Sequence, residues 1–385
     1  MAPRRDHQGA CGVNVELVQF LRYNAKQVAR CHLRYTPEIS RMLALLVCSV
    51  LAAEPADWEK QEAAHLQNIR QVTKDFVRAG EGYFSPDGKT IIFQAQEKDS
   101  HNPFYQIFTM NLASGETHRV SPGVGKTTCS YFRPDGKRII FASSHSDPDA
   151  RKKQMEEYQR RDDDAKAGKH RSYSWDFDSH MKIYEANPDG TDLKVLTPDE
   201  DCYNAEGSYS PDGKQIVFCS NRGDKKSFEL YSMDADGKNV RKLTNTPKCY
   251  NGGPFFSPDG KKVIFRSDRK KEGMLQLHVI NADGTGEKAL TDDTNWVHWA
   301  PYWYKDGKHI IYTAADQGDP TKRPNFDLFW MDIDTGKVTR ITFAPGQDVL
   351  PVFSPDCKKL MWTSTRDGRQ PAELWIADFE APAEK

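Results

Sequence analysis

The sequence of 385 residues has neither a long hydrophobic run nor an excess of one charge. Its apolar segment Met42–Ala53 contains about a dozen residues, whereas a membrane-spanning helix needs about twenty, so no transmembrane segment is expected. Lys and Arg number 54 and Asp and Glu 55, which gives a formal net charge of −1. Because nucleic acids and anionic membranes attract strongly basic surfaces, this balance predicts neither as a partner.

The same apolar segment has the features of a secretory signal. It follows Arg34 and Arg41, which supply positive charge, and it ends in Val50–Ala52, which is small enough at both key positions for signal peptidase. We therefore expect residues 1–53 to be an upstream segment plus signal peptide, and the mature chain to begin at Glu54. This predicts a periplasmic or otherwise exported protein.

Recognised catalytic motifs are also missing. The sequence contains no Gly-x-Ser-x-Gly and no His-Glu-x-x-His. Gly123–Thr128 imitates a phosphate-binding loop, but Val120 stands where the first glycine is needed and no helix is expected to follow. The motifs therefore predict neither a nucleotide site nor a particular enzyme.

The cysteines do not form a disulfide framework. Three of the eight precede Glu54, the other five are an odd number, and no Cys-x-x-Cys pair occurs. Cys202 and Cys249 both open a Cys-Tyr-Asn triplet in adjacent repeats. A disulfide between them is one explanation; descent from a common repeat is the other, and the strict geometry of disulfides favours it.

What the sequence does contain is one phrase of eleven residues that occurs six times. Each copy has an apolar pair, a Pro-Asp-Gly turn or a variant of it, a lysine and an alternating apolar strand, which predicts a β-hairpin. The copies lie at Tyr83–Phe93, Tyr131–Phe141, Ser208–Phe218, Phe255–Phe265, Tyr302–Tyr312 and Val352–Trp362. Their marker residues, five prolines and Lys305, are 48, 77, 47, 47 and 50 residues apart. Hairpins at this period predict one β-propeller blade per repeat.

The rest of each repeat supplies two more strands, the last ending in Leu-Thr or its equivalent. The sixth repeat stops after its third strand, Glu373–Phe379, while an orphan segment, Asn68–Thr73, precedes the first repeat. We expect that segment to complete the last blade, because closing the ring removes exposed strand edges. The sequence thus predicts an all-β, six-bladed β-propeller, monomeric and spanning residues 54–385.

This repeat resembles that of TolB-like β-propellers. The resemblance rests on the Ser-Pro-Asp-Gly-Lys hairpin, the aromatic-capped strand and the Asp-Gly turn, and it covers about Asn68 to Phe379. Since only Glu54–Gln67 separates the expected signal from the first strand, the resemblance implies a propeller without the N-terminal α/β domain of TolB. It implies no single function, because one such fold carries many.

The long second spacing marks an insertion in blade two at about 145–178. Ser146-Asp147-Pro148 predicts the start of a helix, with Met155 and Tyr158 as its apolar edge. The helix is either a lid or docking element over the channel mouth or a solvated surface helix. The aromatic residues of Tyr173–Phe177 are expected to pack at the base of the insertion.

Candidate ligand-binding residues come from aligning the inter-blade loops on the marker residue. Ligands of propellers usually bind where these loops and the innermost strands meet the channel. The polar residues that break the repeat there, together with one tryptophan, are Glu81, Asn204, Glu206, Asn251, His298, Trp299 and Asp348. By contrast, Trp303 is expected in the core, and the recurrent Arg222, Arg269 and Arg366 are expected to form blade-building ion pairs.

These residues allow two functions of different classes. Glu81, Glu206, His298 and Asp348 could hold a divalent cation, Ca²⁺ or Mn²⁺, or bind a basic peptide; they could also merely solvate the channel. Because no catalytic motif is present, we expect a non-catalytic module of the cell envelope that binds a protein or peptide at the channel mouth. The alternative is a metal-dependent lyase or hydrolase acting on polysaccharide or peptide, with His298 as base or ligand.

Overall fold

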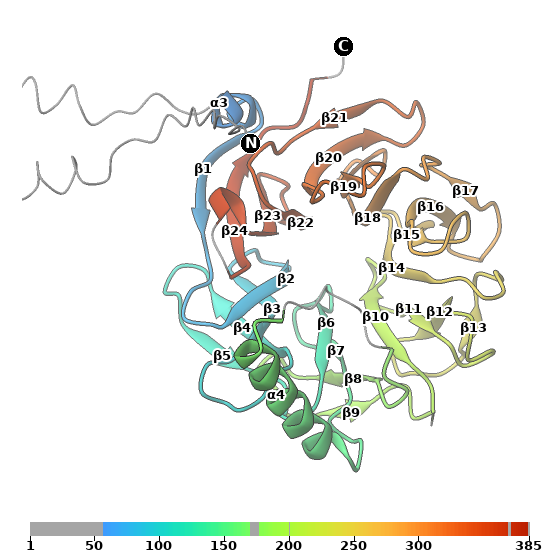
Figure 1. Ribbon diagram of the computed structural model, residues 1–385. Helices are drawn as coiled ribbons and strands as arrows, with labels where there is room; N and C mark the ends of the chain where they lie inside the picture. Colours follow the sequence, from blue (N-terminus) through green and yellow to red (C-terminus); the bar gives the residue numbers. More distant parts are fainter. Residues whose placement is uncertain (1–56, 170–176, 200, 369–370, 384–385) are drawn as a thin grey trace, which may run out of the picture. The chain divides into compact units, whose positions relative to one another are not determined.

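Six four-stranded antiparallel sheets surround a common centre in the computed structural model of the chain (Figure 1). The structure describes residues 57–169, 177–199, 201–368 and 371–383. The predicted six-bladed propeller is confirmed, whereas the predicted signal segment lies outside the described residues. Within the described ranges, no helix is both long enough and apolar enough to span a bilayer.

The first three blades each use four consecutive strands, which follow one another from the innermost outwards. Blade one contains β2 (Arg78–Phe84), β3 (Thr90–Gln96), β4 (Gln106–Asn111) and β5 (Thr117–Arg119). Blade two contains β6 (Thr127–Phe132), β7 (Ile139–Ser143), β8 (Lys182–Ala186) and β9 (Lys194–Val195). Blade three contains β10 (Asn204–Tyr209), β11 (Gln215–Ser220), β12 (Glu229–Asp234) and β13 (Arg241–Lys242).

The last three blades continue the pattern, except that the sixth takes its outer strand from the N-terminal side. Blade four contains β14 (Asn251–Phe256), β15 (Lys262–Ser267), β16 (Gln276–Asn281) and β17 (Lys288–Ala289). Blade five contains β18 (Trp296–Trp303), β19 (His309–Asp316), β20 (Asp327–Asp332) and β21 (Val338–Arg340). Blade six contains β22 (Asp348–Phe353), β23 (Lys359–Ser364), β24 (Glu373–Phe379) and β1 (Leu66–Gln71), with a 3₁₀ turn η1 (Arg366–Gly368) after β23.

Closure of the ring uses the same hydrogen bonds as the other blades. In blade three, Leu230 N–H donates to Thr244 Oγ1 at 2.9 Å, which explains the repeated Leu-Thr ending. In blade six, Leu374 N–H donates to Thr73 Oγ1 at 2.8 Å, although the two residues are 301 positions apart. The orphan segment therefore takes the structural role of a fourth strand, as predicted.

The repeated turn explains why each hairpin forms. Ser85 Oγ donates to Asp87 Oδ1 at 2.6 Å, and the same carboxylate accepts the Lys89 N–H at 3.1 Å. Cys357 occupies the glycine position of the sixth turn with a φ of 58°, a conformation that costs a residue with a side chain about 1 kcal/mol or more. Since Cys357 N–H still donates to Ser354 O, the turn keeps its shape and is strained.

The core lies between the sheets. The last residue of every repeat phrase is at most 2% exposed, and each is aromatic: Phe93, Phe141, Phe218, Phe265, Tyr312 and Trp362. Burial of each such side chain stabilises the fold by about 2–3 kcal/mol. Trp303 is buried as expected, and its Nε1–H donates to Phe255 O at 3.1 Å.

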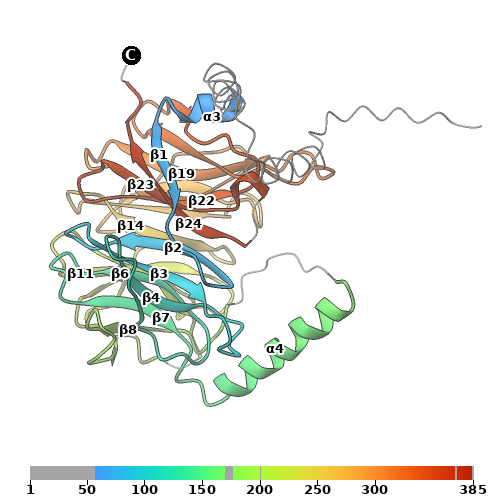
Figure 2. The same ribbon diagram turned by 90° about the vertical axis from the view of Figure 1, so that its left-hand side faces the viewer.

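The insertion in blade two forms the helix α4 (Ala150–Lys166) between β7 and β8. Figure 2 shows it projecting from the propeller. The helix begins at Ala150, later than its predicted start, because the Asp147 carboxylate accepts the Asp149 N–H within a turn and caps no helix. Met155 is 54% exposed. Of the predicted aromatic packing, residues 173–176 lie outside the described residues, while Phe177 packs against Tyr203, Phe228 and Tyr250.

Candidate functional site

The innermost strands carry a ring of six bulged residues. Each strand shifts register against its neighbour at the position five residues before the marker, and each bulged residue has a φ between 46° and 60°: Glu81, Cys129, Glu206, Gly253, Ala300 and Leu350. Five of the six are not glycine, so the backbone is strained at equivalent points around the ring. Strain of this kind gathers at ligand sites, which makes the ring a candidate site.

Glu206 is the most heavily bonded residue of the ring. Its carboxylate accepts the Tyr250 hydroxyl at 2.7 Å and the Arg266 guanidinium at 2.9 Å. It also accepts the Tyr203 hydroxyl at 3.1 Å and the Gly253 N–H at 2.6 Å. The negative charge of Glu206 is therefore neutralised by Arg266 within the propeller.

Two consecutive glycines make room for this arrangement. A Cβ on Gly253 would lie 2.3 Å from Arg266 Nη1, and a Cβ on Gly252 would lie 2.6 Å from Glu206 Oε2. Such distances are far below van der Waals contact. Arg266 can reach Glu206 because blade four has no side chains at these two positions.

Glu81 is less well partnered. Its N–H donates to Thr363 Oγ1 at 2.9 Å, and its carboxyl accepts the Tyr83 hydroxyl only at 3.4 Å. Burial raises the pKa of Glu81 to about 7, against the opposing effects of the Cys129 thiol and the Arg266 charge. Glu81 therefore exchanges a proton near neutral pH and can act as acceptor or donor.

Cys129 lies beside both carboxylates. Burial, reinforced by the charges of Glu81 and Glu206, holds the pKa of its thiol well above the usual range. Since the thiolate is the reactive form of cysteine, Cys129 is not an activated nucleophile at neutral pH.

Trp299 and Arg266 offer hydrogen-bond donors that remain unused among the described residues. The Trp299 Nε1–H is buried and has no partner among the described residues. The Arg266 guanidinium carbon lies 5.8 Å from the centroid of the Trp299 ring, and the guanidinium bonds to Glu206 and Tyr250 through Nη2 alone. We call Glu81, Cys129, Glu206, Arg266 and Trp299 the central cluster.

Three of the predicted site residues lie apart from the central cluster. Each contacts the arginine two residues after the second strand of its own blade: Asn204 with Arg222 at 2.9 Å, Asn251 with Arg269 at 2.6 Å, and Asp348 with Arg366 at 3.2 Å. The same arginines form the ion pairs expected from their recurrence, with Asp199, Glu287 and Glu62. These polar side chains therefore stabilise the blades in which they lie.

His298 also has other neighbours. Its ring packs against Trp296 and Tyr312, and neither ring nitrogen has a hydrogen-bond partner among the described residues. Burial lowers the pKa of His298 to about 4, so the imidazole is neutral at physiological pH.

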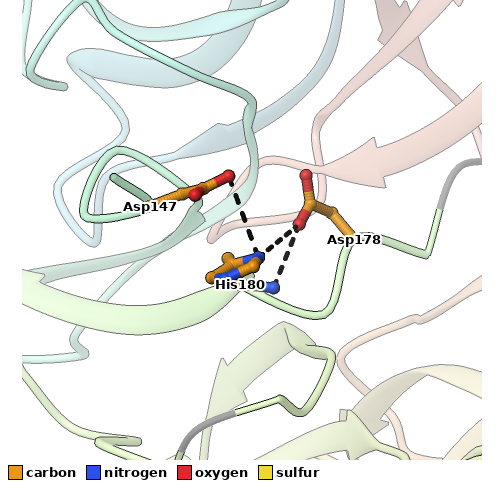
Figure 3. Close-up of side chains that lie close together, drawn as sticks. All are labelled: Asp147, Asp178 and His180. Atoms are coloured by element: carbon orange, nitrogen blue, oxygen red, sulfur yellow. Dashed lines mark hydrogen bonds and ion pairs between the residues drawn. The ribbon is translucent and has the colours of Figure 1, made fainter. Parts of the chain in front are cut away.

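The structure does not bring the four predicted metal ligands, Glu81, Glu206, His298 and Asp348, together. Arg266 and Arg366 neutralise two of them, and His298 packs among aromatic rings. In the part of the chain that the structure describes, a different group of three ligand side chains converges: Asp147, Asp178 and His180 (Figure 3). Cys202 and Cys249 are free thiols, so descent from a common repeat accounts for their matching triplets.

Comparison with known proteins identifies the propeller. A family model described as the dipeptidyl peptidase IV (DPP IV) N-terminal region matches residues 175–370, just over half of the chain. No curated protein matches the chain.

Solved structures give the same fold at low sequence identity. The chain is similar to a putative TolB from Agrobacterium tumefaciens, with 20% identity, a TM-score of 0.52, and coverage of 79% of this chain and 91% of that one. It is also similar to TolB from Acinetobacter baumannii, with 20% identity, a TM-score of 0.50, and coverage of 81% of this chain and 66% of that one. A third similar structure is an oligogalacturonate lyase from Vibrio parahaemolyticus, with 12% identity, a TM-score of 0.51, and coverage of 80% of this chain and 93% of that one. The TolB-like propeller fold is thus confirmed, and likeness at this level concerns the fold alone.

Proposed function

The chain belongs to the family described as the DPP IV N-terminal region, and from that premise we propose a non-catalytic, exported TolB-like propeller that binds a protein or peptide segment. Binding takes place on the innermost strands, at the mouth of the central channel, in the cell envelope. The ligand is a short stretch of polypeptide held by the central cluster.

The unused Trp299 Nε1–H beside Arg266 is the observation that carries this proposal. A buried donor without a partner costs about 1–3 kcal/mol, which a ligand acceptor would recover. Arg266 adds further donors, and Glu81 adds an acceptor at pH values above its pKa of about 7. Peptide bonds present both C=O acceptors and N–H donors, so a polypeptide complements this mixed set.

Two of the three acidic groups of the cluster favour binding over catalysis. The Cys129 thiol is held in its protonated form, and the Glu206 carboxylate is neutralised by Arg266. Neither group is therefore an activated nucleophile or a free general base. The metal-dependent lyase or hydrolase has less support, because its expected ligands Glu81, His298 and Asp348 occupy separate surroundings.

A peptide library selected on the purified chain tests the proposal. Peptides displayed on phage are enriched against the wild-type protein, and the affinity of the best is measured by titration calorimetry. We expect one site per chain and a loss of affinity of about tenfold or more in Trp299→Phe and in Glu81→Gln. Glu116→Gln, at an exposed glutamate just before the outer strand β5 of blade one, is the matched control and should bind as the wild type does.

Two results would overturn the proposal. One is that no peptide is enriched above background. The other is that enriched peptides bind Trp299→Phe, Glu81→Gln and Glu116→Gln equally well, which would place their site elsewhere.

A further inference from the structure

We propose that Asp147, Asp178 and His180 form a binding site for a divalent transition metal that joins the two ends of the α4 insertion. This site goes beyond the peptide binding proposed above and uses none of the same residues. The three side chains converge at the base of the insertion (Figure 3).

The backbone fixes the three side chains where the insertion leaves and re-enters blade two. Asp147 follows β7 and is held by its N–H, which donates to Ser144 O at 3.0 Å. Asp178 precedes β8, and its Oδ1 accepts the His180 N–H at 3.0 Å. Since β7 and β8 are neighbours in one sheet, both ends of the insertion lie together. The sheet therefore brings the three residues together, and the bond between the His180 N–H and Asp178 fixes two of them.

The distances suit a metal. His180 Nδ1 lies 3.5 Å from Asp178 Oδ1 and 3.8 Å from Asp147 Oδ2. Metal–ligand bonds of about 2.0–2.2 Å in a tetrahedral site place neighbouring ligand atoms about 3.3–3.6 Å apart. Small side-chain shifts would bring all three atoms into one coordination sphere.

One ligand atom also lacks a hydrogen bond. His180 Nδ1 is buried and has no hydrogen-bond partner among the described residues, and Asp147 beside it is only 6% exposed. Each carboxylate is balanced by a lysine: Lys153 Nζ hydrogen-bonds to Asp147 Oδ2 at 2.6 Å, and Lys126 Nζ hydrogen-bonds to Asp178 Oδ2 at 3.1 Å, which leaves Asp178 Oδ1 facing His180. Lys153 is 38% exposed, so its long side chain can leave and a metal can take the place of the ammonium group.

The donor set selects the class of metal. One imidazole nitrogen and two carboxylate oxygens suit Zn²⁺ or Mn²⁺, whereas Ca²⁺ needs six to eight oxygens. A cavity of about 560 Å³ borders the site and is lined by Lys126, Lys153 and Asp178. It leaves room for water or a ligand atom on the open side of the metal.

Metal titration of the untagged full chain tests the site. Zn²⁺, Mn²⁺ and Ca²⁺ are each added alone, and binding is measured by calorimetry and by elemental analysis after desalting. We expect one Zn²⁺ or Mn²⁺ per chain, weaker binding by on the order of a hundredfold in His180→Ala, and tighter binding in Lys153→Ala, which removes the competing ammonium group. His118→Ala, at an exposed histidine paired with Glu116, is the matched control and should leave the affinity unchanged.

The variants also separate this site from the peptide site. His180→Ala should keep the affinity for selected peptides, and Trp299→Phe should keep the affinity for metal. The metal site is wrong if wild type and Lys153→Ala both bind no stoichiometric Zn²⁺ or Mn²⁺. It is also wrong if His180→Ala binds metal as tightly as His118→Ala does.

Discussion

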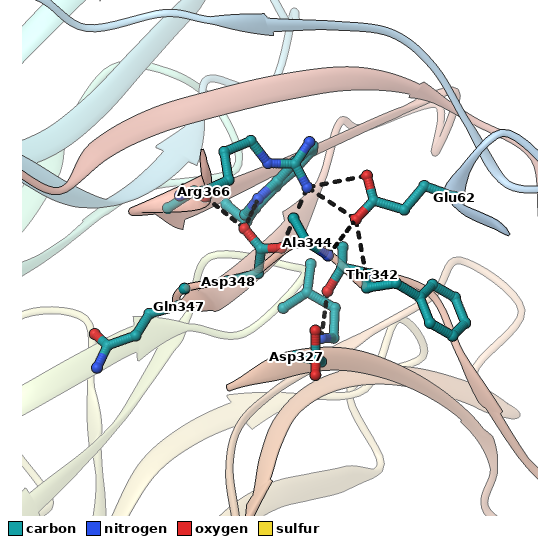
Figure 4. A network of polar contacts seen from close by, with 12 residues as sticks. Glu62, Asp327, Thr342, Ala344, Gln347, Asp348 and Arg366 are labelled. Atoms are coloured by element: carbon teal, nitrogen blue, oxygen red, sulfur yellow. Dashed lines mark hydrogen bonds and ion pairs between the residues drawn. The ribbon is translucent and has the colours of Figure 1, made fainter. Parts of the chain in front are cut away.

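Replacing Arg366 with methionine should destabilise the propeller more than any equivalent change in another blade. Arg366 Nη2 donates to Glu62 Oε1 at 3.0 Å and to Asp348 Oδ2 at 3.2 Å (Figure 4). All three side chains are at most 3% exposed. Glu62 belongs to the N-terminal helix α3 (Asp57–Glu62), so the network fastens that helix to blade six.

The magnitude follows from what the substitution leaves behind. Arg366→Met would leave two buried carboxylates without a cation, and breaking a buried pair in this way costs about 3–5 kcal/mol. Burial already raises the pKa of Glu62 and Arg366 opposes that shift, so without Arg366 the carboxyl would protonate more readily. Protonation would relieve part of the cost, which places the expected loss near the lower end, about 3 kcal/mol.

Arg222→Met is the matched control for this experiment. Arg222 occupies the same repeat position in blade three and also lies over aromatic rings, but its partner Asp199 is 42% exposed. Exposed ion pairs contribute about 1 kcal/mol or less. Both variants are unfolded in urea and followed by tryptophan fluorescence, and the midpoints are compared at unchanged slope. If Arg366→Met loses no more stability than Arg222→Met, the buried network does not fasten the ring.

Three other predictions concern pH, backbone and processing. Burial raises the pKa of Glu373 from 4.5 to about 7, so between these pH values the folded chain keeps a proton that the unfolded chain loses, and the free energy of unfolding falls by about 3 kcal/mol as pH rises. Glu373→Gln should reduce this pH dependence, as measured by urea midpoints between pH 4.5 and 7.5. Gly253→Ala should lower the free energy of unfolding by about 2 kcal/mol and abolish peptide binding, because the new Cβ would displace Arg266. Its control, Gly336→Ala, is also at positive φ but has open space around it, and should cost about 1 kcal/mol of stability and leave peptide binding intact. N-terminal sequencing of the protein recovered from its native cell should begin at Glu54; a chain that still begins at Met1 would contradict export.

The fold was predictable because its information is local and repeated. Each Ser-Pro-Asp-Gly turn is stabilised by contacts within five residues, such as those of Ser85 and Asp87, so a hairpin can be recognised without knowing its neighbours. Even ring closure left a local signal, because Thr73 carries the hydroxyl that ends a fourth strand elsewhere. The start of α4 was predicted less accurately, because Asp147 is a good capping residue that here bonds within a turn instead.

The site was only partly predictable, for a reason of strand geometry. Positions seven and five before the marker, such as His298 and Ala300, would share a face of a regular strand. The bulge at the second position breaks the two-residue alternation, so the candidates taken from the two positions meet different neighbours. Arg266 and Tyr250 were missed because they lie outside the aligned positions. The pair Gly252–Gly253 leaves the space that they use, and the repeated Cys-Tyr-Asn triplet was a sequence signal for Tyr250.

The ring of bulged residues is symmetric in backbone and asymmetric in chemistry, and this difference indicates how a ligand would lie. Blades one to three place Glu81, Cys129 and Glu206 at the ring position, while blades four to six place Gly253, Ala300 and Leu350 there. Because Glu206 is already neutralised by Arg266, Glu81 is the carboxylate available to a ligand. A bound segment should therefore direct a basic or N–H donor group towards blade one and an apolar group towards blades five and six.

We expect selected peptides to pair a basic residue with a neighbouring apolar one, and the preference for the basic residue to weaken below pH 7 as Glu81 takes up its proton. Peptide selection at pH 5.5 and at pH 8 measures this preference directly. An equal preference for the basic residue at both pH values would mean that Glu81 is not the group that binds it.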